Sequence, residues 1–101
     1  MKKYQVFVRG ENFLMRFDEQ DQKLGFYTTV FVEAQDQEDA ELQAMELLRN
    51  DQKLVSSSLN KKSDSPMMFV ESIEGLESFQ GLNLPRTGFS FFSEKSEMEE
   101  A

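Results

Sequence analysis

The spacing of apolar residues changes near residue 35, from the period of a strand to that of a helix, and that change limits the folds open to this chain. Residues 26–34 are rich in aromatic and β-branched side chains, which favour a β-strand. One face of that strand would carry Phe26, Thr28, Val30, Val32 and Ala34. The other face would carry Tyr27, Thr29, Phe31 and Glu33. The central predicted element is therefore a strand that ends near residue 35, where the next element begins.

Beyond residue 36 the apolar residues recur at helical spacing. Asp36 is a suitable N-cap, acidic residues follow in the first turn, and Asn50 is a suitable stop, so we predict a helix over residues 37–50. Its apolar stripe consists of Ala40, Ala44, Leu47 and Leu48. Because two members of the stripe are alanines, the first turns of the helix can lie close to a sheet.

Two further strands are predicted before residue 20. Residues 3–9 alternate, with Tyr4, Val6 and Val8 on one side, and residues 13–17 alternate again. Gly10 and Asn12 tolerate positive φ, so we expect a tight hairpin there, and a polar turn over residues 18–22. Together with residues 26–34, these segments predict a three-strand antiparallel meander.

The C-terminal half has weaker signals. Residues 67–73 are apolar enough for a fourth strand, the spacing of Ile73, Leu76 and Phe79 suggests a helical turn, and residues 89–92 suggest a short last strand. We therefore predict an α+β fold: an antiparallel sheet, made of the three-strand N-terminal meander and one or two C-terminal strands, with one main helix packed on one face. Residues 1–93 would form a single domain and residues 94–101 a charged, frayed tail.

The composition excludes several chemistries. None of the 101 residues is Cys or His, which removes disulfides, thiolate or imidazole catalysis and the usual zinc sites. The net charge of −8, concentrated beyond residue 33, argues against nucleic-acid binding. No apolar run is long enough to cross a membrane, and Arg9 interrupts the first one too early for a signal peptide. We expect a cytoplasmic protein with no cofactor and no metal.

The densest acidic patch invites a functional interpretation. It consists of Glu33, Asp36, Glu38, Asp39 and Glu41. Paired carboxylates can perform acid–base or metal chemistry. Helix capping, however, accounts for Asp36, Glu38 and Asp39, and solvation accounts for Glu41. The patch remains a candidate docking site for a basic protein partner.

Two other groups of polar residues were weighed for chemistry. Asp18, Glu19 and Asp21 form a cluster of oxygen ligands that lacks the calcium-loop spacing, and a solvated turn explains it better. The serines at 56–58 lie near Lys61 and Lys62 without a Ser–Lys motif. We therefore expect no catalytic residue, with a carboxylate-dependent metalloenzyme as the least favoured alternative.

Residues 31–41 resemble a strand-to-helix module that is common in small α+β bacterial domains, including HicB-type antitoxins. In that module an acidic pair followed by alanine opens the helix, as Glu38, Asp39 and Ala40 do here. The glycine-rich turn usual in HicB-type proteins is missing from this chain. The resemblance implies a strand-to-helix connection and carries no function.

The feature that bears most on function is the second face of the predicted sheet. If the valines of residues 6–8 and 30–32 face the helix, apolar side chains also lie on the opposite face, where water would favour polar ones. The candidate interface residues are Phe7, Leu14, Tyr27, Phe31 and, on the helix, Leu42. The C-terminal segment or a second copy of the chain would cover that face. We expect a non-catalytic module for protein–protein interaction or an accessory role, with a homodimer as one form of that interaction. The alternative is a domain that binds a small ligand in the aromatic space between the sheet and the C-terminal segment.

Overall fold

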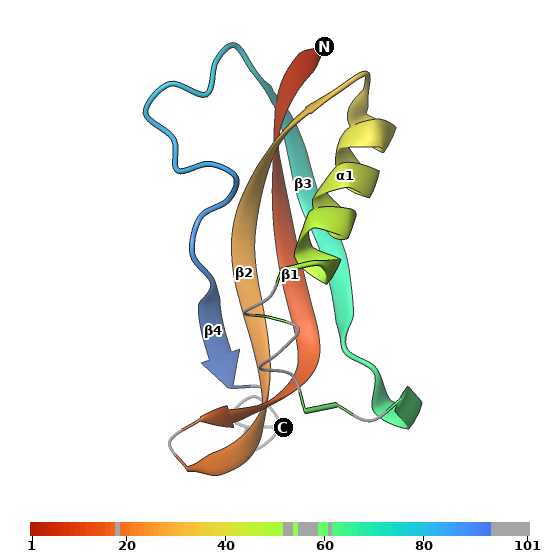
Figure 1. Ribbon diagram of the computed structural model, residues 1–101, viewed down its shortest axis with the longest axis vertical. Coiled ribbons are helices and arrows are strands. Elements are labelled where there is room, and N and C mark those ends of the chain that lie inside the picture. Colours follow the sequence, from red (N-terminus) through yellow and green to blue (C-terminus); the bar gives the residue numbers. More distant parts are fainter. Residues whose placement is uncertain (18, 52–53, 55–58, 61, 94–101) are drawn as a thin grey trace.

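The architecture is a four-stranded antiparallel sheet with a helix on one face. The computed structural model describes residues 1–17, 19–51, 54, 59–60 and 62–93. Its elements are β1 (Lys2–Phe17), β2 (Gln20–Ala34), α1 (Gln37–Arg49), the short 3-10 helix η1 (Lys62–Asp64), β3 (Met67–Leu76) and β4 (Ser90–Ser93). The strand order is β3-β1-β2-β4, and α1 packs along the sheet (Figure 1). The predicted α+β class, with its single main helix, is confirmed, while the predicted tail at 94–101 lies outside the described residues.

The N-terminal part differs from the predicted meander, because it holds two long strands instead of three. β1 and β2 pair on both sides of one irregularity, from Lys2 opposite Ala34 to Phe17 opposite Gln20. The predicted hairpin at residues 10–12 is wrong. A β-bulge takes its place, with one extra residue of β1 between Gly10 and Phe13.

The bulge explains why the residues around it look like a turn. Asn12 does adopt a positive φ of 61°, as a turn residue would. The extra residue reverses the alternation of β1, so that Val6 and Val8 are buried before it and Phe13 and Met15 after it. The chain keeps its direction through the bulge. It reverses direction between β1 and β2, near residue 19, within the predicted polar turn.

Residues 59 and 60 seal the edge of β1 beyond the bulge. The Leu59 N–H donates to the Leu14 carbonyl at 2.7 Å. The side-chain amide of Asn60 accepts from the Leu14 N–H and donates to the Asn12 carbonyl, each at 2.8 Å. A loop thus provides the hydrogen bonds of a neighbouring strand at a point where β3 no longer pairs with β1.

The same corner holds a carboxylate whose titration can be measured. Asp64 accepts from the Lys23 ammonium and from the Asn12 amide, both at 2.8 Å, and these bonds lower the pKa of Asp64 below its ordinary value of 3.8. A lowered folded-state pKa stabilises the fold above the unfolded pKa, and that stability is lost as the pH falls through the folded pKa. At about pH 7 the wild type should therefore unfold at a higher urea concentration than the Asp64→Asn variant. This difference in urea midpoint should become smaller as the pH falls towards about 2.

The matched control for this titration is Glu77→Gln, because Glu77 is also an exposed carboxylate. It should leave the urea midpoint almost unchanged at both pH values, since isolated surface charges contribute little. An Asp64→Asn difference that grows on acidification would contradict the assignment.

The start of α1 is fixed by Asp36, the predicted N-cap, together with a hydrogen bond from Gln35 to Asp39. The Asp36 carboxylate accepts from the Asp39 N–H at 2.9 Å, and the Asp39 carboxylate accepts from the Gln35 N–H at 3.0 Å. Ala40 and Ala44 are fully buried, so the helix lies close to the sheet. The predicted helix is therefore confirmed to within one residue of its end.

The core lies between α1 and the sheet and continues towards the hairpin. Its first cluster consists of Tyr4, Val6, Val8, Val30, Val32, Ala34, Ala40, Ala44 and Leu48. Its second cluster consists of Phe13, Met15, Leu24, Phe26 and Leu54. Met68 and Phe89 contact both clusters and join them into one apolar layer. Burying each large aliphatic side chain contributes about 1.5–3 kcal/mol.

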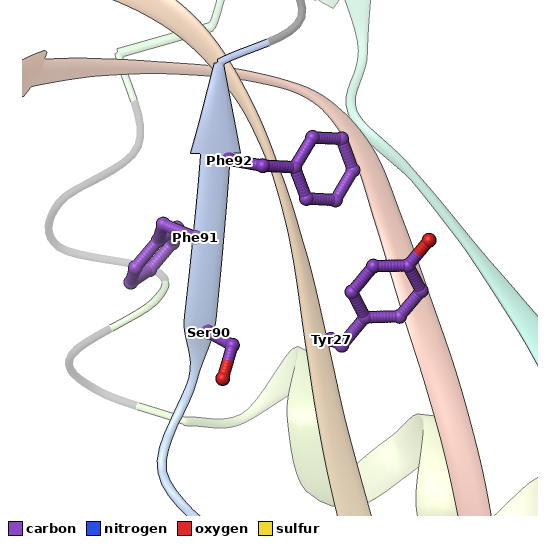
Figure 2. Close-up of a pocket in the computed structure, with 4 residues that line it drawn as sticks. All are labelled: Tyr27, Ser90, Phe91 and Phe92. Carbon is purple, nitrogen blue, oxygen red and sulfur yellow. The ribbon is translucent and has the colours of Figure 1, made fainter.

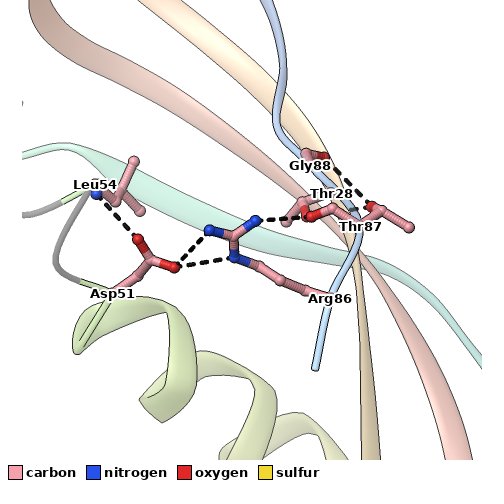
Figure 3. Close-up of polar contacts among 6 residues, drawn as sticks. All are labelled: Thr28, Asp51, Leu54, Arg86, Thr87 and Gly88. Atoms are coloured by element: carbon pink, nitrogen blue, oxygen red, sulfur yellow. Dashed lines mark hydrogen bonds and ion pairs between the residues drawn. The ribbon is translucent and has the colours of Figure 1, made fainter. Parts of the chain in front are cut away.

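The C-terminal segment runs along the outer edge of β2. β4 pairs with residues 24–27, and further along the edge the Phe31 N–H donates to the Pro85 carbonyl and the Thr87 N–H to the Thr29 carbonyl, both at 2.9 Å. Arg86 reaches from this segment to Asp51 just after α1 (Figure 3). The predicted helical turn over residues 73–79 is wrong, because β3 continues to Leu76 and residues 77–79 are not helical. Pairing with residues 3–5 of β1 holds residues 74–76 extended.

Candidate interaction surface

The sheet face opposite α1 carries a diagonal row of aromatic rings. Phe7 of β1 stacks on Tyr27 of β2 with ring centroids 5.4 Å apart and planes 3° apart. Tyr27 in turn contacts Phe92 of β4, also at 5.4 Å. Figure 2 shows Tyr27 and Phe92 together, with Phe91 pointing to the other side of β4. We call Phe7, Tyr27 and Phe92 the aromatic strip.

Phe7 and Tyr27 of the strip are partly exposed, whereas Phe31, which lies on the same face of β2, is buried. Phe7 is 37% exposed and Tyr27 is 38% exposed. Phe31 is only 7% exposed and packs near Phe79, with ring centroids 6.3 Å apart. Among the described residues, the C-terminal segment therefore covers the Phe31 end of this face and leaves Phe7 and Tyr27 partly in water.

Other aromatic residues of the C-terminal segment lie on the helix side of the sheet. Phe89 and Phe91 pack against Phe26, with centroid distances of 4.9 and 6.1 Å. Within the C-terminal segment, Phe79 therefore covers part of the second face, next to Phe31, whereas Phe89 and Phe91 pack against the helix side.

Phe92 belongs to the candidate surface and was missed by sequence reasoning. It pairs with Gly25, and a Cβ placed on Gly25 would lie 2.2 Å from the Phe92 ring, so only glycine leaves room for the ring there. A glycine inside a strand beside aromatic residues was the available signal, since such a glycine often marks a close approach by another group.

Arg9 is the cation nearest the strip on β1, and it is ion-paired. Arg9 forms ion pairs with Glu11 and Glu71, and its guanidinium lies 4.8 Å from the centre of the Phe69 ring. This cation therefore already has two carboxylates and an aromatic ring as partners. The surface around Phe7 and Tyr27 is thus an apolar patch bordered by an ion-paired arginine and, on β3, by the exposed carboxylates of Glu71 and Glu74.

A hollow opens at the β4 end of the strip. It has a volume of about 310 Å³ and is lined by Tyr27, Ser90, Phe91 and Phe92 (Figure 2). Ligand pockets begin at about this size, and they bury most of the ligand surface. Two hydroxyl groups and three aromatic rings give it the chemistry to hold a small flat molecule.

The remaining candidate interface residues are separated from the strip. Leu14 is half-buried, pairs with Lys23 and lies beyond the bulge, towards the hairpin end of β1. Leu42 is exposed on α1, which packs against the other face of the sheet. The structure therefore brings Phe7 and Tyr27 together, covers Phe31, and places Leu42 on a different surface.

The acidic patch divides into two parts. Asp36 and Asp39 hold the N-terminus of α1, and Asp39 also accepts from the Gln43 side chain at 3.1 Å. Glu38 and Glu41 project from the helix, while Glu33 is exposed near the end of β2, opposite Lys3 in the sheet. Within the described residues, no group of three or more Asp or Glu side chains is arranged to hold a metal ion.

The other candidate groups are only partly described. Asp18, the serines at 56–58 and Lys61 lie outside the described residues. Asp21 forms an exposed ion pair with Arg16 at 3.0 Å. In the part of the chain that the structure describes, no helix combines the length and apolar character needed to span a membrane.

The chain was also compared with known proteins. No family model, no curated protein and no solved structure gives a significant match.

Proposed function

We propose that this protein is a non-catalytic interaction module that forms a homodimer through the aromatic strip. The observation that carries the proposal is the stacked pair Phe7 and Tyr27, which stays more than one third exposed on a sheet face whose neighbouring Phe31 is buried. Exposed aromatic groups of this kind are enriched where proteins bind one another.

The charge distribution supports a second copy as the partner on this face. The chain has a net charge of −8, yet the acidic side chains of α1 project from the element on the opposite side of the sheet. Beside the strip, Arg9 and its two carboxylates are already paired. Two copies can therefore bring their strips together by a two-fold rotation without placing their most acidic surfaces in contact.

The size of the strip indicates a weak dimer. An aromatic side chain buries about 150–250 Å², and the three side chains of the strip are already partly buried. A stable complex of standard size buries about 800 Å² on each partner. We therefore expect a dissociation constant on the order of 100 μM, so that the monomer and dimer exchange at ordinary protein concentrations.

Sedimentation equilibrium tests the proposed dimer. Phe7→Thr and Tyr27→Thr keep a residue that favours strands but remove the rings, and each should weaken the dimer about tenfold or more. Leu42→Thr is the matched control, because it removes an exposed apolar side chain from another surface. A wild-type protein that remains monomeric at about 1 mM, or equal weakening by all three variants, would overturn the proposal.

Binding of a small aromatic ligand is the second candidate, and the hollow beside Tyr27 favours it. The two functions share Tyr27 but differ in stoichiometry. A ligand would bind the monomer. The Phe7→Thr variant should bind that ligand with the affinity of the wild type, because Phe7 does not line the hollow. For either function we place the protein in the cytoplasm, since a chain without cysteine gains nothing from an oxidising compartment.

A further inference from the structure

The sheet has one long edge that is open in the described part of the chain. The C-terminal segment occupies the edge of β2 from Leu24 to Phe31, and Leu59 and Asn60 seal β1 beyond the bulge. β3, ten residues long, pairs with β1 on one side and with no described strand on the other. An edge of this kind offers a row of backbone donors and acceptors to another extended chain.

The side chains of β3 restrict what can pair with it. On the helix side, the half-buried Met68, Val70 and Ile73 pack against the core and form an apolar border. On the opposite side, Glu71 and Glu74 are exposed. Glu71 pairs with Arg9, whereas Glu74 accepts only a neutral hydrogen bond, from the Gln5 amide at 2.8 Å, among the contacts described. The edge therefore presents apolar groups on one face and acidic groups on the other.

These charges disfavour a second copy of the chain as the occupant. Antiparallel pairing of two β3 strands would gather four carboxylates, Glu71 and Glu74 from each copy, near the middle of the new pair. Like charges on neighbouring strands are destabilising, and both chains carry a net charge of −8. Acidic residues on an edge strand thus select against self-pairing and in favour of a basic partner.

We propose that β3 binds an extended, basic segment of another protein by strand addition. Backbone hydrogen bonds to β3 supply the affinity, apolar side chains of the segment lie beside Val70 and Ile73, and its Lys or Arg side chains reach Glu74. This surface is distinct from the aromatic strip, so the inference does not depend on the proposed dimer.

A pair of synthetic peptides tests the inference. The first is a capped ten-residue peptide of alternating lysine and valine, and the second replaces each lysine with glutamate. We expect the lysine peptide to bind and to slow amide hydrogen exchange within β3, which reports strand addition and not charge attraction alone. The glutamate peptide should bind at least about tenfold more weakly.

Charge reversal at one position locates the contact. Glu74→Lys should weaken binding of the lysine peptide about fivefold. Glu38→Lys, which makes the same change in net charge on α1, should alter it less than about twofold. Equal effects of the two variants, equal binding of the two peptides, or protection confined to α1 or to the aromatic strip would overturn the inference.

Discussion

Replacing Phe26 with alanine is expected to lower the free energy of unfolding by about 3–5 kcal/mol, as full truncation of a core aromatic side chain usually does. Phe26 is completely buried, and its ring contacts Phe13 and Phe89 at centroid distances of 5.1 and 4.9 Å. It belongs to the cluster nearest the hairpin and contacts Phe89, which packs against both core clusters. Urea unfolding followed by circular dichroism measures the loss.

The control for this prediction is Phe91→Ala, because Phe91 contacts the same ring but is 45% exposed. It should cost less than about 1.5 kcal/mol, since much of its surface stays in water. Small domains have a total stability of only about 5–15 kcal/mol, so Phe26→Ala has a large effect on the fraction folded. Equal losses from the two variants would contradict the packing described here.

Gly10 gives a second test of the same contact. It lies opposite Phe26 on β1, and a Cβ at this position would lie 2.2 Å from the Phe26 ring. Because that ring is buried and cannot swing away, Gly10→Ala should destabilise the fold by about 1–3 kcal/mol. Gly25→Ala meets the Phe92 ring at the same distance, but that ring lies at the surface and can move, so a smaller loss is expected.

Arg86→Met is expected to lower the free energy of unfolding by about 2–4 kcal/mol, somewhat less than the loss of one partner from a fully buried ion pair. Figure 3 shows the guanidinium between the C-terminal segment and the end of α1. Its Nε and Nη2 donate to Asp51 at 2.9 and 2.7 Å, and Nη1 donates to the Thr87 carbonyl at 2.8 Å. The side chains of Arg86 and Asp51 are only 17% and 14% exposed.

An exposed ion pair provides the matched control for Arg86. Arg16 and Asp21 have the same chemistry, but their side chains are 67% and 46% exposed, so Arg16→Met should cost at most about 0.5 kcal/mol. If Arg16→Met lowers the free energy of unfolding as much as Arg86→Met does, the burial of the Arg86–Asp51 pair is not the source of the effect.

The elements that depend on local patterns could be predicted from the sequence. The alternation of residues 26–34 predicted the second part of β2, which begins earlier, at Gln20, and the capping by Asp36 predicted the helix to within one residue. The burial of Val6 and Val8 beneath α1 follows from the same pattern. These features are determined by residues close together in the chain.

Features that depend on distant pairing were harder to predict. Asn12 suits both a turn and a bulge, and what decides between them is the pairing of β1 with β2 on both sides of it. The change from buried even residues to buried odd residues is what the bulge produces, and the polar residues 9–12 between them suit a turn equally well. Likewise, residues 74–76 are extended because β1 lies beside them, against their local spacing.

The candidate surface was predicted in part. Phe7 and Tyr27 do lie together on the face opposite the helix, as the alternation implied. The cover of Phe31 by Phe79 depends on the path of residues 77–88, which contain no regular pattern. Phe92 joins the strip only because Gly25 leaves room for its ring, a contact between strands far apart in the sequence.

Cross-linking through introduced cysteines tests the proposed dimer most directly, because the chain contains no cysteine of its own. Ser72 is exposed and pairs with Phe7, so Ser72→Cys places a single thiol beside the aromatic strip. Leu42→Cys places one on α1 as the control. With a short bismaleimide, we predict covalent dimers from Ser72→Cys that rise with protein concentration and disappear when Tyr27→Thr is added. Equal cross-linking at Leu42, or none at Ser72 where sedimentation shows a dimer, would contradict the account.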